Sequence, residues 1–115
     1  MKSTIISDTT ALIVLSKLEQ FSLLSNLFER VIIPSVVYDE LITKEAIALP
    51  DFFQIEPVSH HDIMLELMVL DAGEAQAISL ANRLKLPLLI DEQKGRKIAH
   101  HQGDSVLVKV ALIIS

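Results

Sequence analysis

The chain begins with a short apolar run that ends at an acid, STIISD at residues 3–8, and the pattern returns as LPLLID at residues 86–91. Both runs have the length of buried strands. Two more candidate strands lie between them, at residues 31–33, where Pro34 ends the run, and at residues 52–58. Helical patterns separate these strands, so the order predicts βαβ units and a mostly parallel sheet with helices on both faces.

The segments between the strands have the periodicity of helices. Thr9 or Thr10 is expected to cap the first helix, which extends through Leu18. Pro34 suits the first turn of a helix that runs to about Ala48. The other expected helices cover residues 20–28, 60–70, 72–85 and 92–102, and an apolar run at residues 106–114 follows them.

Length and composition favour one globular domain, residues 1–115, over a disordered or membrane-spanning chain. Half of the 115 residues are hydrophobic and 22% are charged, which suits a packed core. The chain has no Cys, which excludes disulfides and sulfur-ligated zinc and favours the cytoplasm. No stretch reaches the ~20 apolar residues of a membrane span. We therefore expect a cytoplasmic protein with no membrane segment.

The formal charge of −5 is unevenly distributed along the chain. Residues 1–82 carry 4 Lys/Arg and 12 Asp/Glu, a balance of −8, whereas residues 83–115 carry 6 and 3, a balance of +3. A protein that binds nucleic acid through bulk positive charge would not show this distribution. An acidic site beside a local basic patch would show it.

Four acids fall at the boundaries of the expected elements: Asp8, Glu40, Glu74 and Asp91. In parallel sheets, ligands bind at the carboxyl ends of strands where the strand order reverses. Two unit charges ~5 Å apart at an effective dielectric constant of ~20 repel by about 3 kcal/mol, so four converging carboxylates need cations. Oxygen ligands favour Mg²⁺ or Mn²⁺, and up to two such ions would neutralise the four charges. A metal pair of this kind can activate water for phosphodiester cleavage.

Each of these acids also has a purely structural interpretation. Asp71 and Glu74 have the spacing of a capping box. Asp8 and Asp91 are suitable N-caps, and Glu40 can pair with the lysine four residues further along its helix. Taken singly, the acids therefore leave both interpretations open.

Four blocks of sequence resemble the signature motifs of PIN domains, in the family's order and with similar spacing. They are ISDTTALI at residues 6–13, IIPSVVYDEL at 32–41, GEAQAI at 73–78 and LIDE at 89–92. The set is most similar to the prokaryotic subgroup with a DTSPLI start and a GEAEAI helix. The resemblance implies a three-layer α/β/α fold, and we expect the strand order 3-2-1-4-5.

The resemblance also implies a function, which is that of a Mg²⁺- or Mn²⁺-dependent ribonuclease, often the toxin of a type II toxin–antitoxin pair. RNA would be the substrate, an antitoxin protein would be a partner, and a homo-oligomer is expected. Thr9 and Thr10 match small hydroxyl residues that help to order the site, and Glu92 matches a position often filled by a second acid. The family's metal-site acids fall on Asp8, Glu40, Glu74 and Asp91.

A basic segment follows the last of these acids. Lys94, Arg96 and Lys97 lie in the helix expected after residue 91. Basic side chains next to a metal site can hold the phosphates that flank a scissile bond. A solvated helix face is the alternative interpretation of the same residues.

The end of the sequence departs from the PIN pattern. The family continues after its fifth strand with a Gly-Thr-Leu-Gly-like segment and further helices, whereas residues 108–111 are VKVA, and we expect this chain to be shortened by the family's C-terminal helices. This departure motivates an alternative function, a non-catalytic, shortened PIN-like module that acts through protein contacts. A flavodoxin-like phosphoacceptor is a second alternative, although no Gly-rich phosphate loop is present.

Overall fold

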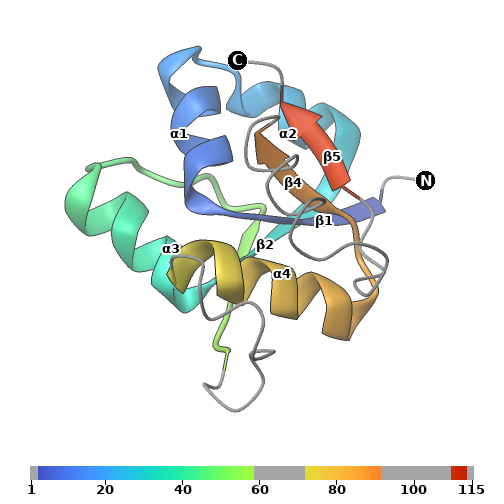
Figure 1. Ribbon diagram of the computed structural model, residues 1–115. Coiled ribbons are helices and arrows are strands. Elements are labelled where there is room, and N and C mark those ends of the chain that lie inside the picture. The colour runs from blue at the N-terminus through green and yellow to red at the C-terminus, as the bar shows by residue number, and fades with distance from the viewer. Residues whose placement is uncertain (1–2, 59–71, 92–109, 114–115) are drawn as a thin grey trace.

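The computed structural model describes residues 3–58, 72–91 and 110–113, and its strands form one parallel sheet (Figure 1). The sheet has five strands in the order β3-β2-β1-β4-β5, which confirms the expected order. The strands are β1 (Ser3–Ser7), β2 (Phe28–Pro34), β3 (Phe53–Glu56), β4 (Leu88–Asp91) and β5 (Val110–Ile113).

The central strands alternate between two buried faces because successive side chains of a strand point to opposite sides. Ile5 and Ile6 of β1 are both fully buried, yet they belong to different clusters of the core. Ile6 is aligned with Ile32 of β2 on one side and with Leu88 of β4 on the other. A run of consecutive apolar residues is therefore what a central strand covered on both faces requires.

Helices cover both faces and give the three layers that the PIN resemblance implies. One face packs against the helices that follow β1 and β2, and the other packs against the helix that precedes β4. Their bounds are α1 (Thr9–Lys17), α2 (Phe21–Leu27), α3 (Ser35–Asp39), the π-helix η1 (Glu40–Lys44) and α4 (Ala72–Leu84). In the described parts of the chain, no helix is long and apolar enough to cross a membrane.

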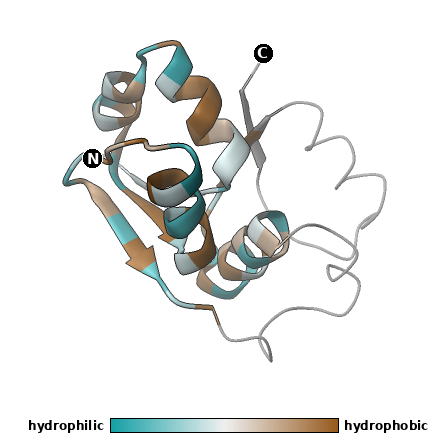
Figure 2. Ribbon diagram, turned by 90° about the vertical axis from the view of Figure 1, so that its left-hand side faces the viewer, coloured by the Kyte–Doolittle hydropathy of each residue, from teal (hydrophilic) through white to brown (hydrophobic). Residues whose placement is uncertain are grey.

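Strand β3 lies at one edge of the sheet and is only partly covered. Its hydropathy alternates along its length, as Figure 2 shows. Ile55, which is aligned with Ile33 of β2, remains 43% exposed. The expected third strand is thus confirmed, although it is shorter than residues 52–58.

Two expectations about helix ends are wrong. The first helix is capped by Asp8 rather than by Thr9 or Thr10, because the Asp8 carboxylate accepts a hydrogen bond from the amide of Ala11. The helix after β2 does not run to Ala48, because it widens into η1 and ends at Lys44. The helices expected over residues 60–70 and 92–102 lie outside the described residues, whereas part of the run at 106–114 forms β5.

Three helices end at a non-glycine residue with a positive φ: Glu19 (56°), Ala46 (53°) and Lys85 (58°). After α4, the amide of Leu86 donates to the carbonyl oxygen of Ala81 at 3.1 Å. This is the hydrogen bond of a Schellman motif, which closes a helix through one left-handed residue. Glycine takes that conformation without the steric cost that a side chain adds.

Candidate active site at the carboxyl edge of the sheet

The order of the strands reverses between β1 and β4, and this point positions the candidate site. Ser7, the last residue of β1, is aligned with Leu89 of β4. Asp8 follows Ser7 directly, and Asp91 is the last residue of β4. The two aspartates therefore leave neighbouring strands at the same edge, where ligands of open α/β sheets bind.

Asp8 is a buried carboxylate at the start of α1. It is 1% exposed, and Oδ1 accepts a hydrogen bond of 3.0 Å from the amide of Ala11. Oδ2 is buried as well. The hydroxyl of Ser7, also fully buried, donates to the Asp8 carbonyl oxygen at 3.0 Å. The N-cap interpretation of Asp8 is thus confirmed, and the cap holds this carboxylate in a defined position at the strand end.

Glu74 is a second buried acid at the same edge. It lies in the first turn of α4 and is 3% exposed. Only three residues separate the end of α4 from β4, so its last turn lies near the amino edge. The 13 residues of α4 span ~20 Å, so its first turn returns to the carboxyl edge. Figure 1 shows α4 beginning on the side where β1 leads into α1.

Glu40 lies at the transition from α3 into η1 and is half-buried. Its carbonyl oxygen accepts from the amide of Glu45 at 3.1 Å, five residues on, and Leu41 accepts from Ile47 at 2.9 Å. Single π-helical turns are rare and occur often at functional sites. Because α3 begins directly after β2, Glu40 stands in the second turn above the carboxyl edge. The sequence predicts its helix but not this widening.

Hydroxyl side chains flank Asp8 along the chain, and a further buried hydroxyl lies in α4. Thr9 is 7% exposed, and within the described ranges its Oγ1 has no hydrogen-bond partner. Thr10, next to it in α1, is half-buried. Ser79 of α4 is 5% exposed, and its Oγ likewise has no partner in the part of the chain that the structure describes. Sequence reasoning did not single out the buried hydroxyls of Ser7 and Ser79, since a serine in an apolar segment gives no signal by itself.

The remaining candidate residues have no described side chains. Asp91 is placed by its backbone alone, at the end of β4. Glu92, Lys94, Arg96 and Lys97 lie outside the described residues, as does Asp71 of the suggested capping box. Among the side chains that are described, no group of three or more His, Asp or Glu is arranged to hold a metal ion. The donors at this edge are carboxylate oxygens, which fit a hard divalent cation.

The chain belongs to a PIN-domain family: the profile of the family DUF3368, described as a PIN domain, matches residues 4–114. No curated protein is significantly similar to the chain. PIN domains are usually nucleases and typically bind divalent metal ions. The resemblance to PIN domains and the fold that it implied are therefore confirmed, and a nuclease-like function follows from the family.

Proposed function

We propose that the protein is a Mg²⁺- or Mn²⁺-dependent endoribonuclease that hydrolyses phosphodiester bonds of RNA. Up to two metal ions would be held by carboxylates at the carboxyl edge of the sheet, with Glu92 as an additional acid. The ions would activate water and stabilise the leaving oxygen. The four principal ligands are Asp8, Glu40, Glu74 and Asp91.

The observation that carries this proposal is the burial of two acids, Asp8 and Glu74, at the edge where the strand order reverses. Desolvating a carboxylate is costly, so hydrogen bonds, ion pairs or bound cations compensate the charge of a buried acid. The hydrogen bond that the Asp8 carboxylate accepts from the amide of Ala11 in α1 offsets part of this cost. A divalent cation bound at this edge would compensate several carboxylates at once.

The chain's own residues would position the site. The N-cap hydrogen bond would orient the carboxylate of Asp8. The π-helical turn would fix the position of Glu40 on its helix. Thr9, with its buried hydroxyl, and Thr10 would help to order the groups around the metal. Lys94, Arg96 and Lys97 would bind the phosphates next to the scissile bond.

We further propose that the protein acts in the cytoplasm as the toxin of a type II toxin–antitoxin pair, with an antitoxin protein as its partner and a homo-oligomer as its working form. The family membership and the acid set support the nuclease part of this proposal. The biological pairing rests on the resemblance to toxin-like PIN domains alone.

The decisive experiment is cleavage of mixed RNAs by the full chain in Mn²⁺, in Mg²⁺ and in EDTA. We expect cleavage that requires metal and disappears in Asp8→Asn and in Glu74→Gln. Asn is as good an N-cap as Asp, so Asp8→Asn removes the charge while keeping the cap. Glu29→Gln is the matched control, because Glu29 is an exposed acid near the start of β2.

Absence of metal-dependent cleavage in both metals would contradict the proposal and favour the non-catalytic PIN-like module. Cleavage that persists in Asp8→Asn at the wild-type rate would contradict the assignment of the site. A labile phosphate on the protein after incubation with a small phosphodonor would instead favour the phosphoacceptor alternative.

A further inference from the structure

Ser7 is a fully buried polar residue at the end of an apolar strand. Side chains alternate along a strand, so Ser7 points to the same face of the sheet as Ile5, which belongs to the apolar cluster that α1 covers. A buried hydroxyl loses its hydrogen bonds to water, and it weakens a core unless it gains a partner in the protein. Alanine would fill the same position without this cost. The hydrogen bond of Ser7 is therefore what distinguishes it from an apolar residue.

The partner of this hydroxyl is the backbone of Asp8. The Oγ atom of Ser7 donates a hydrogen bond of 3.0 Å to the Asp8 carbonyl oxygen. Asp8 is the N-cap residue of α1, and the carbonyl oxygen of an N-cap residue is the first hydrogen-bond acceptor of its helix. The Ser7 hydroxyl therefore restrains the peptide group through which β1 leads into α1.

Asp8 lies just beyond the part of β1 that pairs with its neighbours. The alignment of β1 with β2 ends at Ile6, and its alignment with β4 ends at Ser7. The backbone of Asp8 is extended, with a φ of −93° and a ψ of −179°. Because this ψ sets the direction in which α1 begins, its rotation would move the amide of Ala11 away from Oδ1 of Asp8. Ser7 is thus anchored to the sheet by its backbone and holds the next residue by its side chain.

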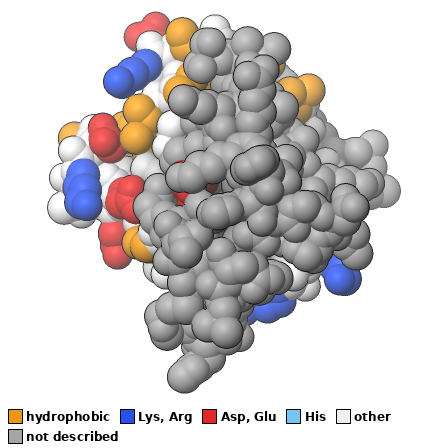
Figure 3. Space-filling model, viewed as in Figure 1, with side chains coloured by type: hydrophobic (Ala, Val, Ile, Leu, Met, Phe, Trp, Pro, Cys, Tyr) orange, Lys and Arg blue, Asp and Glu red, His pale blue; other side chains and the backbone are white. Residues whose placement is uncertain are grey.

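The placement of a buried carboxylate depends on the backbone that carries it. Figure 3 shows acidic side chains on the left-hand side of the molecule that lie at the surface beside Lys and Arg, where water solvates them. Asp8 is 1% exposed and lacks this freedom to reorient in water. Metal sites need their ligands in defined positions, and the groups that orient a ligand through hydrogen bonds affect metal affinity strongly. A restraint on the Asp8 backbone is therefore a restraint on its carboxylate.

We propose that Ser7 is a positioning residue of the candidate metal site. Its hydroxyl holds the carbonyl oxygen of Asp8, and this contact fixes the Asp8 carboxylate in the position from which it binds a divalent cation. Ser7 acts through Asp8 and is not a ligand itself, since its hydroxyl donates to the carbonyl oxygen rather than to the carboxylate. The inference rests on the proposed function, in which Asp8 is a metal ligand.

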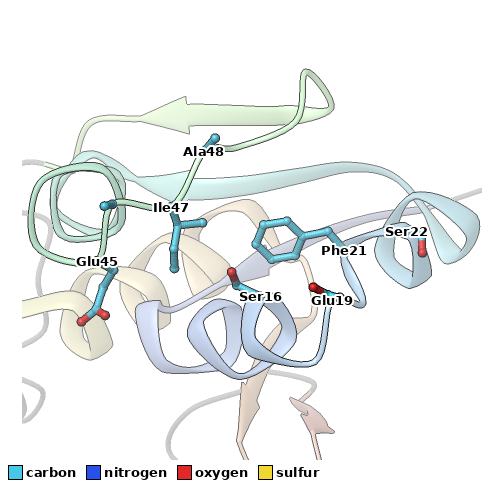
Figure 4. Close-up of a pocket in the computed structure, with 8 residues that line it drawn as sticks. Ser16, Glu19, Phe21, Ser22, Glu45, Ile47 and Ala48 are labelled. Carbon is cyan, nitrogen blue, oxygen red and sulfur yellow. The ribbon is translucent and has the colours of Figure 1, made fainter.

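Calorimetric titration of the full chain with Mn²⁺ tests the proposal. Ser7→Ala removes the hydroxyl and should weaken Mn²⁺ binding about tenfold, whereas Ser7→Thr keeps the hydroxyl and should stay within about twofold of the wild type. Ser16→Ala is the matched control, because Ser16 lies at the opposite end of α1, ~12 Å from Asp8 along the helix axis. Figure 4 shows Ser16 there, beside an open pocket that Phe21 and Ile47 line. The control should bind Mn²⁺ as the wild type does, and circular dichroism should show that every variant is folded.

Hydrogen exchange in EDTA gives a second readout that needs neither metal nor RNA. The amide of Ala11 donates to Oδ1 of Asp8, and it should exchange about fivefold faster in Ser7→Ala, because a buried hydrogen bond is lost. Ser16→Ala should leave this exchange unchanged.

The outcomes separate this inference from the proposed function. A wild type that binds no Mn²⁺ would overturn the proposed function, and the metal role of Ser7 with it. If the wild type binds Mn²⁺, equal affinity in Ser7→Ala would overturn the assignment of Ser7 alone, even if that variant unfolds at a lower urea concentration. Unchanged exchange at Ala11, or a Ser7→Thr variant that binds Mn²⁺ as weakly as Ser7→Ala, would overturn it too.

Discussion

The Oδ1 atom of Asp8 accepts a hydrogen bond from the amide of Ala11 at 3.0 Å, so one buried carboxylate both begins α1 and stands at the candidate active site. The capping and metal-binding interpretations of this aspartate do not exclude each other. A carboxylate has two oxygens, and the helix N-terminus favours a negative charge beside it. Substitutions at position 8 can separate the two roles.

Asp8→Ala is expected to lower the free energy of unfolding by ~1 kcal/mol in the absence of metal, because it removes the N-cap of α1. Asp8→Asn is expected to lower the free energy of unfolding by at most a few tenths of the loss in Asp8→Ala, since the side-chain oxygen of Asn can accept the same hydrogen bond from the amide of Ala11. Urea unfolding in EDTA measures both values. Equal destabilisation by the two variants would show that charge, rather than capping, is what stabilises the fold at this position.

Glu74→Gln is expected to weaken stabilisation by metal. If Mn²⁺ binds the native protein, the wild type should gain ~2.7 kcal/mol at a metal concentration 100 times the dissociation constant. The difference in Tm between Mn²⁺ and EDTA should shrink in the variant, because one charged ligand is lost. Glu29→Gln should keep the full difference, and an unchanged Tm difference in Glu74→Gln would remove this residue from the ligand set.

Lys85→Gly is expected to raise the free energy of unfolding by ~0.5 kcal/mol. Lys85 has a φ of 58° at the end of α4, and a side chain in this conformation costs about 1–2 kcal/mol, of which the greater entropy of unfolded Gly returns part. Lys85→Ala is the control, because Ala keeps the steric cost while removing the charge. Thermal unfolding should therefore rank Gly above Lys and Ala, and a less stable Gly variant would contradict the explanation.

Leu41→Ala is expected to destabilise the protein by ~2–5 kcal/mol, because the side chain is fully buried and its truncation leaves a cavity. Ile42→Ala, one residue further along η1, should cost less than ~1 kcal/mol, since Ile42 is 39% exposed. Urea unfolding of the two neighbours compares them directly. Similar losses would mean that the π-helical segment does not present Leu41 to the core.

Much of the fold could be predicted from the sequence because short-range patterns dictate it. The run at residues 3–7 matches β1 in full, and the expected helix at residues 72–85 matches α4 to within one residue. Short apolar runs that are bounded by acids or Pro predict buried parallel strands. The placement of Asp8 at a strand end followed from the same pattern.

The two wrong expectations concern helix ends, where specific hydrogen bonds rather than residue types determine the backbone conformation. Thr9 and Asp8 are both good capping residues, but the backbone of Asp8 is still extended whereas Thr9 is already the first residue of α1. Glu40 looks like an ordinary helical residue, yet the bond from Glu45 to its carbonyl oxygen makes the turn π-helical. Local propensity does not distinguish one N-cap from the other or an α-helical turn from a π-helical one. The free-energy differences between such alternatives are small, and tertiary packing overrides them.

The sequence by itself determined a parallel α/β sheet, because hydropathy periods are a property of the chain alone. The order of its motifs indicated the PIN family, and the strand order was expected from that resemblance. Only the tertiary structure decided that Asp8 and Glu74, 66 positions apart, are both buried toward one edge, and that Leu18 and Leu27 remain outside the core. Burial depends on which elements pack against a residue. These packing contacts form between segments that are far apart in the chain, so local sequence patterns do not reveal them.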